Sequence, residues 1–309
     1  MTIDECEKIF DQALSSTTEG AFCHAIEPLF KEYKILSIRL ARGSIYWRAR
    51  LIEENKKEYS NIVELDYVPS GSVSRGRLND EGESCFYIST HQHTTLVEKD
   101  VTEGQLVQIA GFRVINESPL LVIIGEYANV QKYGYMRLTG SDPDGTIANL
   151  MNEKPLEEAL TEIYIDKFFI DILGDSNARK IDYLFTRALS KAIYSKHTYG
   201  GIIYPSAKDP DGFNIGVKIK PSDESFHNVC CSVVKITKKR RFGVIDYTTI
   251  KAAKTLDDDG NFIWCDGGGP DKFRLYNMSK EEYDVASINP NDKNNLIKVL
   301  RCGRKHANK

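Results

Sequence analysis

The chain has 309 residues, of which 41% are hydrophobic and 28% charged, a composition typical of a globular protein with a sizeable core. Its formal net charge of −3 argues against a nucleic-acid-binding protein, which usually carries a strong basic excess. No apolar run approaches the roughly 18 residues of a membrane span, and the acidic first residues are unlike a signal peptide. We therefore expect a cytoplasmic protein with neither a nucleic acid nor a membrane as partner.

The cysteines and histidines do not have the spacing of a metal site. The seven cysteines are odd in number and contain no CxxC pair, which is typical of reduced thiols in packing positions. His91 and His93 flank a single glutamine, but no cysteine pair lies near them in the sequence. Because a structural zinc site needs closely spaced pairs of ligands, we expect no bound metal.

The first third of the chain predicts helices followed by strands. Residues 4–36 carry apolar side chains at helical spacing and predict two amphipathic helices, separated by capping and breaker residues at 15–22. The segment 44–52 is rich in β-branched and aromatic residues and predicts a strand. Residues 68–82 contain a proline and several glycines and predict a loop. A short strand is expected at 85–90.

The next segments predict one helix and two strands. Residues 93–101 have the pattern of a helix, with Thr94 or Thr95 as its N-cap. The segments 105–115 and 120–127 are apolar and β-branched, and both predict strands.

The second half of the chain predicts helices and then strands. Residues 141–146 have strong turn chemistry, and the pattern is helical from 147 to 197 with an interruption at 173–177. Four further strands are expected, at 200–207, 214–219, 230–236 and 241–247. Residues 257–270 predict a loop, the glycine-rich segment 267–271 a surface loop, and the basic C-terminal residues a frayed end.

The order of elements is helices, strands, helices, strands, which favours an α+β fold over a regular βαβ alternation. The chain also lacks a GxGxxG motif after a strand, so we do not expect a Rossmann dinucleotide site.

Three stretches carry residues that suit a nucleotide ligand. The first places two arginines among aromatic residues on the strand expected at 44–52. The second combines glycine, arginine and asparagine in the loop at 68–82, and runs on to a tyrosine and a glutamate. The third is a Tyr-Pro-Ser triplet near the end of the strand expected at 200–207. In chain order, the residues are Trp47, Arg48, Gly76, Arg77, Asn79, Gly82, Tyr87, Glu98, Tyr204, Pro205, Ser206 and Asn214.

This ordered set resembles the signature of the RES domain family, which is named for its arginine, glutamate and serine. The resemblance covers residues 45–214, and the second stretch is its most diagnostic part. Two positions depart from the family pattern: Leu78 stands where the family often has Trp, Ala or Phe, and Ser89 where it often has Ala. Neither departure removes a charged residue.

The resemblance implies a fold like that of the ADP-ribosyltransferases, an α+β domain whose mixed sheets form a cleft for NAD⁺. It implies three consecutive parts: an N-terminal helical segment at 1–40, a RES-like NAD⁺-binding domain at 41–250, and a C-terminal extension at 251–309 that packs on this domain.

The residue types suit NAD⁺ chemistry. Guanidinium groups bind phosphate oxygens by paired hydrogen bonds, which fits Arg48 and Arg77 to the diphosphate. An aromatic face such as Tyr87 attracts the cationic nicotinamide ring. The carboxylate of Glu98 suits an oxocarbenium-like ribose or its attacking nucleophile. The candidate catalytic residues are therefore Glu98, Arg77 and Ser206.

The remaining candidate NAD⁺-binding residues are Asn79, Ser206 and Asn214, which suit ribose or phosphate oxygens. Each has a structural alternative: Asn79 and Ser206 are also typical turn residues, just as Tyr87 suits a core and Glu98 a solvated helix. For Ser206 the ligand contact predicts that removing the hydroxyl leaves the stability of the free protein unchanged, whereas a turn cap predicts a loss. We favour the ligand contact.

The resemblance implies NAD⁺ glycohydrolysis or phosphorolysis that depletes NAD⁺ as a toxin does. NAD⁺ is then a substrate, phosphate a second one in the phosphorolytic case, and a small antitoxin or immunity protein a partner. Transfer of ADP-ribose to a protein, and a non-catalytic nucleotide-binding or interaction module, are the alternatives.

Overall fold

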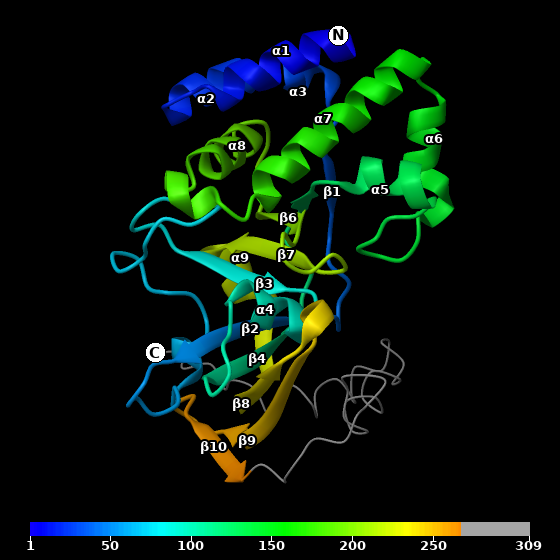
Figure 1. Ribbon diagram of the computed structural model, residues 1–309. Helices are drawn as coiled ribbons and strands as arrows, with labels where there is room; N and C mark the ends of the chain where they lie inside the picture. Colours follow the sequence, from blue (N-terminus) through cyan, green and yellow to red (C-terminus); the bar gives the residue numbers. More distant parts are fainter. Residues whose placement is uncertain (267–309) are drawn as a thin grey trace. The chain divides into compact units, whose positions relative to one another are not determined.

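The computed structural model describes residues 1–266 (Figure 1), and the chain divides into two compact units. Unit 1 comprises Met1–Arg39, Val68–Tyr87 and Pro119–Pro221, and unit 2 comprises Leu40–Tyr67, Ile88–Ser118 and Ser222–Lys309. The units are interleaved along the chain. The three consecutive parts implied by the resemblance remain a prediction. The loop expected at 267–271 and the basic C-terminal residues lie outside the described residues.

Unit 1 contains most of the helices. Helix α1 begins with a capping box in which Thr2 and Glu5 satisfy each other's backbone N–H groups. The ring of Phe10 in α1 stacks on Phe168 in α7, with centroids 4.0 Å apart, and Figure 1 shows α1 and α2 alongside α7 and α8. The helices are α1 (Ile3–Leu14), α2 (Glu19–Ile26), α3 (Leu29–Glu32), α5 (Glu126–Tyr133), α6 (Thr146–Asn152), α7 (Leu156–Gly174), η3 (Ala178–Ile181) and α8 (Leu184–Tyr194). The two N-terminal helices are confirmed, and α3 was not anticipated.

The strand expected at 120–127 is shorter than predicted, because a helix begins within it. Strand β5 ends at Ile123 and α5 begins at Glu126, after Gly125 with a φ of +102°. The carboxylate of Asp166 in α7 accepts hydrogen bonds from the backbone N–H groups of Gly125 (2.9 Å) and Ala128 (3.1 Å). It therefore caps α5 from a distant part of the sequence. Burial raises the pKa of this carboxyl group to about 6.

Unit 1 also holds a small mixed sheet in the order β1-β5-β6-β7. Strands β5 and β6 pair in parallel, and the other pairs are antiparallel. The strands are β1 (Leu36–Ile38), β5 (Leu121–Ile123), β6 (Gly201–Pro205) and β7 (Phe213–Lys218). In the β6–β7 pair, Tyr204 lies opposite Asn214.

Unit 2 is built on an antiparallel sheet in the order β2-β4-β8-β9-β10. These strands are β2 (Ile45–Ile52), β4 (Leu106–Val114), β8 (Phe226–Lys239), β9 (Ile245–Leu256) and β10 (Phe262–Asp266). Strand β10 falls where a loop was expected, and residues 241–243 form a short 3₁₀ turn (η4) instead of the start of a strand. Strand β3 (Cys85–Ser89) enters unit 2 at its end, where Ser89 pairs with Trp47.

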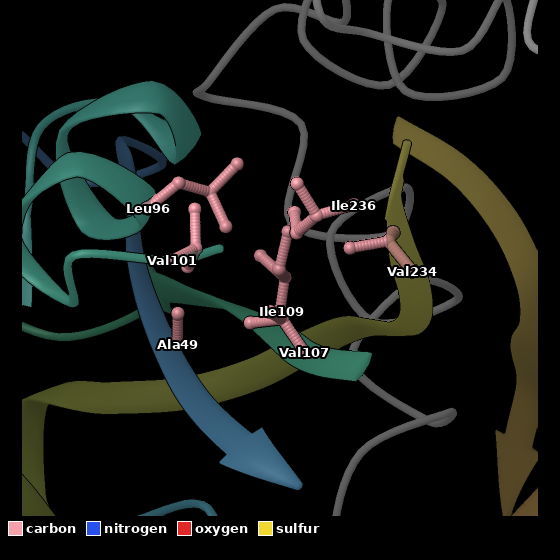
Figure 2. Packing of buried hydrophobic residues seen from close by; sticks show 7 residues of the cluster. All are labelled: Ala49, Leu96, Val101, Val107, Ile109, Val234 and Ile236. Atoms are coloured by element: carbon pink, nitrogen blue, oxygen red, sulfur yellow. The ribbon is translucent and has the colours of Figure 1, made fainter. Parts of the chain in front are cut away.

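Helix α4 (Gln92–Glu98) packs on the sheet of unit 2. Figure 2 shows the buried cluster, with Leu96 of α4 and Val101 beside Val107 and Ile109 of β4. The N-cap residue of this helix is His91. The predicted cap at Thr94 or Thr95 is wrong, because both threonines are buried inside the helix.

Three short elements complete the described chain: η1 (Ile62–Glu64) in unit 2, η2 (Pro143–Gly145) in unit 1, and α9 (Ile219–Ser225), which was not anticipated. The protein is thus a mixed α and β structure with parallel and antiparallel strand pairs, in agreement with the α+β class expected from the sequence. None of its helices within residues 1–266 is long and apolar enough to cross a membrane.

Candidate functional site

The loop at residues 74–82, here called the arginine loop, is held in shape by a tyrosine and an asparagine. The hydroxyl of Tyr87 accepts a hydrogen bond from the backbone N–H of Leu78 (2.8 Å) and donates one to Oδ1 of Asn79 (2.9 Å). The Nδ2 of Asn79 donates to two backbone carbonyls, at 3.1 and 2.9 Å. Asn79 is only 3% exposed, so its amide serves the loop itself.

Ion pairs connect the arginine loop to two helices of unit 1. Asp80 pairs with Arg187 and with Lys191 (2.6 Å), both in α8. These two cations also pair with Glu19 of α2. Burial opposes ionisation of Asp80, but hydrogen bonds from Lys191 and Arg187 outweigh it and hold the pKa of this carboxyl group below its ordinary value. The side chain of Arg187 is only 8% exposed, which makes it the buried centre of this network.

A strained turn of unit 1 contacts the two arginines of the loop. Asp182 and Tyr183 both have left-handed backbone conformations, with φ of +53° and +58°, which are unfavourable for residues other than glycine. Asp182 forms an ion pair with Arg75, and the ring of Tyr183 lies under the guanidinium of Arg77, 6.0 Å from its centroid. The strained conformation therefore places a carboxylate and an aromatic face against the loop.

Arg77 itself carries an unsatisfied donor. Its Nη1 atom is buried and has no hydrogen-bond partner among the described residues. A buried donor without a partner costs free energy, and the surrounding contacts hold this one in place. A guanidinium in this state is suited to an anionic ligand such as phosphate.

Strand β7 packs against the arginine loop at a glycine. A Cβ atom at Gly216 would lie 2.4 Å from Cδ1 of Leu78 and 3.4 Å from Cε1 of Tyr87, so only glycine allows this approach. Residues two apart on a strand share a face. Asn214 therefore lies on the face of β7 that carries the loop, together with its directly opposed neighbour Tyr204.

Ser206 follows β6 and caps a turn. Its Oγ accepts hydrogen bonds from the backbone N–H groups of Lys208 (3.2 Å) and Asp209 (3.0 Å). The turn-cap interpretation is thus observed, and the expectation that Ser206 does not contribute to the stability of the free protein needs correction.

Unit 2 contains Arg48 on β2 and Glu98 at the end of α4. Both are half-buried, and their charges act on the ammonium of Lys99. Although Lys99 is an exposed residue, desolvation of its ammonium, followed by the charges of Arg48 and Arg50, lowers the pKa of Lys99 to about 8, and Glu98 opposes the shift. The helix end therefore carries one carboxylate among three basic side chains.

Several of these residues cannot be identified from the sequence alone. Asp80, Tyr183, Arg187 and Lys191 support the arginine loop through contacts between segments about a hundred residues apart. No local sequence pattern distinguishes these residues. The two on α8, for example, belong to a segment with the pattern of an ordinary amphipathic helix. Among residues 1–266, no three His, Cys, Asp or Glu side chains lie together as a metal site requires.

The RES domain model matches residues 45–235, which is more than half of the chain. The chain belongs to the RES domain family. No curated protein matches its sequence. The matched range includes every candidate residue named from the sequence, as well as Lys99, Tyr183 and Arg187. The match begins at the first residue of β2 and ends within β8. The N-terminal helices and the turn between β8 and β9 therefore lie outside it.

Proposed function

We propose that this RES-domain protein binds NAD⁺ and cleaves the bond between nicotinamide and ribose, passing ADP-ribose to water or phosphate. The observation that carries the proposal is the Nη1 of Arg77, a buried donor without a hydrogen-bond partner among the described residues. Arg77 belongs to the arginine loop, which Tyr87 and the ion pairs of Asp80 hold in place. The chain is also a member of the RES domain family. A preorganised guanidinium of this kind is suited to a diphosphate.

The residues of unit 1 divide into ligand contacts and supports. Arg77 binds a diphosphate oxygen, and the ring face of Tyr87 contacts nicotinamide, since its hydroxyl is engaged by the loop. Asn214 and Ser206 serve ribose or phosphate oxygens. Asn79 acts through the loop rather than on the ligand, because its amide is used internally.

Glu98, Arg48 and Lys99 have the following roles in this proposal. When the glycosidic bond breaks, its electron pair moves to the nicotinamide nitrogen and cancels the charge of the ring. The ribose carbon is then left with oxocarbenium character. The carboxylate of Glu98 stabilises this charge and orients the oxygen that attacks the same carbon. Arg48 supplies a second cation for the diphosphate, and Lys99 adds positive charge beside it.

NAD⁺ depletion by this reaction gives the protein a toxin-like role, with a small antitoxin or immunity protein as its partner. The test is to incubate the purified chain with NAD⁺, with and without phosphate, and to identify the products by NMR and mass spectrometry. We expect free nicotinamide together with ADP-ribose or its phosphate ester.

Two other outcomes would replace this proposal. A discrete labelled protein band after incubation of a lysate with labelled NAD⁺, lost in Glu98→Gln, would establish ADP-ribosyl transfer to a protein. Intact NAD⁺ under every nucleophile condition would instead favour a non-catalytic binding module.

A further inference from the structure

The turn between β8 and β9, here called the hairpin tip (residues 238–244), concentrates charge and exposed apolar surface. Four consecutive basic residues, at 238–241, are all exposed. They are followed by Phe242, which is 99% exposed, and Val244, which is 50% exposed. Large apolar side chains are mostly buried in this protein, so a phenylalanine entirely in water is unusual and suggests an interaction surface.

The backbone fixes the exposure of this ring. The N–H of Arg240 donates a hydrogen bond to the carbonyl of Val244 (2.8 Å) and closes the turn. Phe242 has a φ of +62° and Gly243 one of +76°. The left-handed conformation is unfavourable at Phe242. The turn nevertheless holds the ring outward, away from the apolar core of unit 2.

The charges of the hairpin tip are only partly neutralised. Arg240 pairs with Asp246 (2.6 Å), and Lys238 also lies near this carboxylate. Lys239 and Arg241 form no ion pair within residues 1–266. The tip therefore offers cations on either side of an exposed aromatic ring.

We propose that the hairpin tip binds the surface of an anionic membrane, with Phe242 and Val244 entering the interface and the neighbouring cations contacting lipid phosphates. Apolar side chains combined with Lys and Arg are the composition of interfacial membrane contacts. Val244 adds an exposed aliphatic side chain that cannot stack on a base but can enter a lipid interface, which favours lipid over RNA. The expectation of no membrane partner rests on the lack of a spanning segment, and this has no bearing on surface contact.

The proposal is tested with the full chain and vesicles of phosphatidylcholine, with and without phosphatidylserine, in a sedimentation assay. We expect binding to the anionic vesicles only, weakened by salt. Phe242→Ser should weaken this binding by on the order of tenfold or more. Lys239→Gln and Arg241→Gln should each weaken it about fivefold.

Two matched variants control for general effects of charge and apolarity. Leu156 is 73% exposed in unit 1 and Lys254 is exposed on β9. Leu156→Ser and Lys254→Gln should therefore bind the vesicles as the wild type does. In Phe242→Trp, the added fluorescence should shift to shorter wavelength with the anionic vesicles alone.

Three results would overturn the proposal. The first is equal binding of wild type, Phe242→Ser and Arg241→Gln. The second is equal binding of the wild type to neutral and anionic vesicles. The third is binding of an RNA homopolymer that depends on Phe242 while the vesicles do not bind, which would make the tip a nucleic-acid surface.

Discussion

The arginine loop and the hairpin tip both present cations, but they differ in what surrounds them. In the arginine loop, Arg77 is half-buried and the loop is fixed by Tyr87, by the Asp80 ion pairs and by the Tyr183 ring. In the hairpin tip, the basic side chains are exposed. A fixed guanidinium presents its N–H groups in set directions and can select one ligand. Exposed, flexible cations recognise a charged surface instead.

The largest expected difference concerns stability. Arg187→Met removes the buried cation that pairs with Asp80 and Glu19. We expect it to lower the free energy of unfolding by about 2–4 kcal/mol, because breaking a buried ion pair leaves its partners uncompensated and these carboxylates are still partly hydrated. Denaturant unfolding measures the change.

The matched variant in the hairpin tip is Arg240→Met, which breaks the exposed pair with Asp246 and should leave the unfolding midpoint unchanged. Equal midpoints for Arg187→Met and the wild type would show that the network does not support unit 1.

The second prediction separates ligand recognition from stability. Arg77→Lys keeps the charge but loses the planar guanidinium, so NAD⁺ affinity should fall by about 1–3 kcal/mol with little change in stability. Calorimetric titration on a Glu98→Gln background measures this without turnover. Arg179→Lys, at an exposed position of unit 1, is the control and should bind normally. Wild-type affinity in Arg77→Lys would move the phosphate contact elsewhere.

The sequence predicts some parts of this fold and not others. The fold class, most helices and strands, and the arginine loop follow from local patterns of apolar, turn and glycine residues. The end of β5 and the start of α5 do not, because the capping carboxylate of Asp166 lies 41 residues away from Gly125. The role of Arg187 could not be predicted either, because its partners lie on segments remote in the sequence.

The candidate residues themselves could be named from the sequence. Which of them contact a ligand and which support the loop could not be predicted. Tyr87 and Asn79 suggested ligand contacts by residue type, yet the structure engages the Tyr87 hydroxyl and the Asn79 amide within the loop. The sequence does not show that Gly216 must be glycine, because the side chain that excludes a Cβ there is Leu78, which lies in a loop remote in the sequence.

The third prediction concerns Ser206, which caps a turn and is also a candidate ligand contact. Ser206→Ala should lower the free energy of unfolding by about 0.5–2 kcal/mol, by analogy with helix caps, and should also reduce NAD⁺ turnover. Thermal melting and nicotinamide release measure the two effects, with exposed Ser176→Ala as control. A less stable variant with wild-type turnover would leave Ser206 a structural residue only.

The smallest expected effect is a pH dependence. The pKa of Asp80 is held below its ordinary value of 3.8 in the folded protein, so the unfolded chain takes up a proton at a higher pH than the folded one. The ion pairs of Asp80 therefore stabilise the protein above about pH 4 and lose this effect as the pH falls further. Asp80→Asn should flatten the acid limb of an unfolding curve. Asp258→Asn, at an exposed position, should not, and identical limbs in Asp80→Asn and wild type would contradict the role given to Asp80.

The rate of nicotinamide release from NAD⁺ tests the proposed activity most directly. Wild-type protein should release nicotinamide, and Glu98→Gln should reduce turnover on the order of 100-fold or more, as expected when a charge partner of the transition state is lost. Glu54→Gln, at an exposed position in the same unit, should retain wild-type turnover. Equal rates for Glu98→Gln and Glu54→Gln, or no release by the wild type, would contradict the assignment of this RES-domain protein as an NAD⁺-cleaving enzyme.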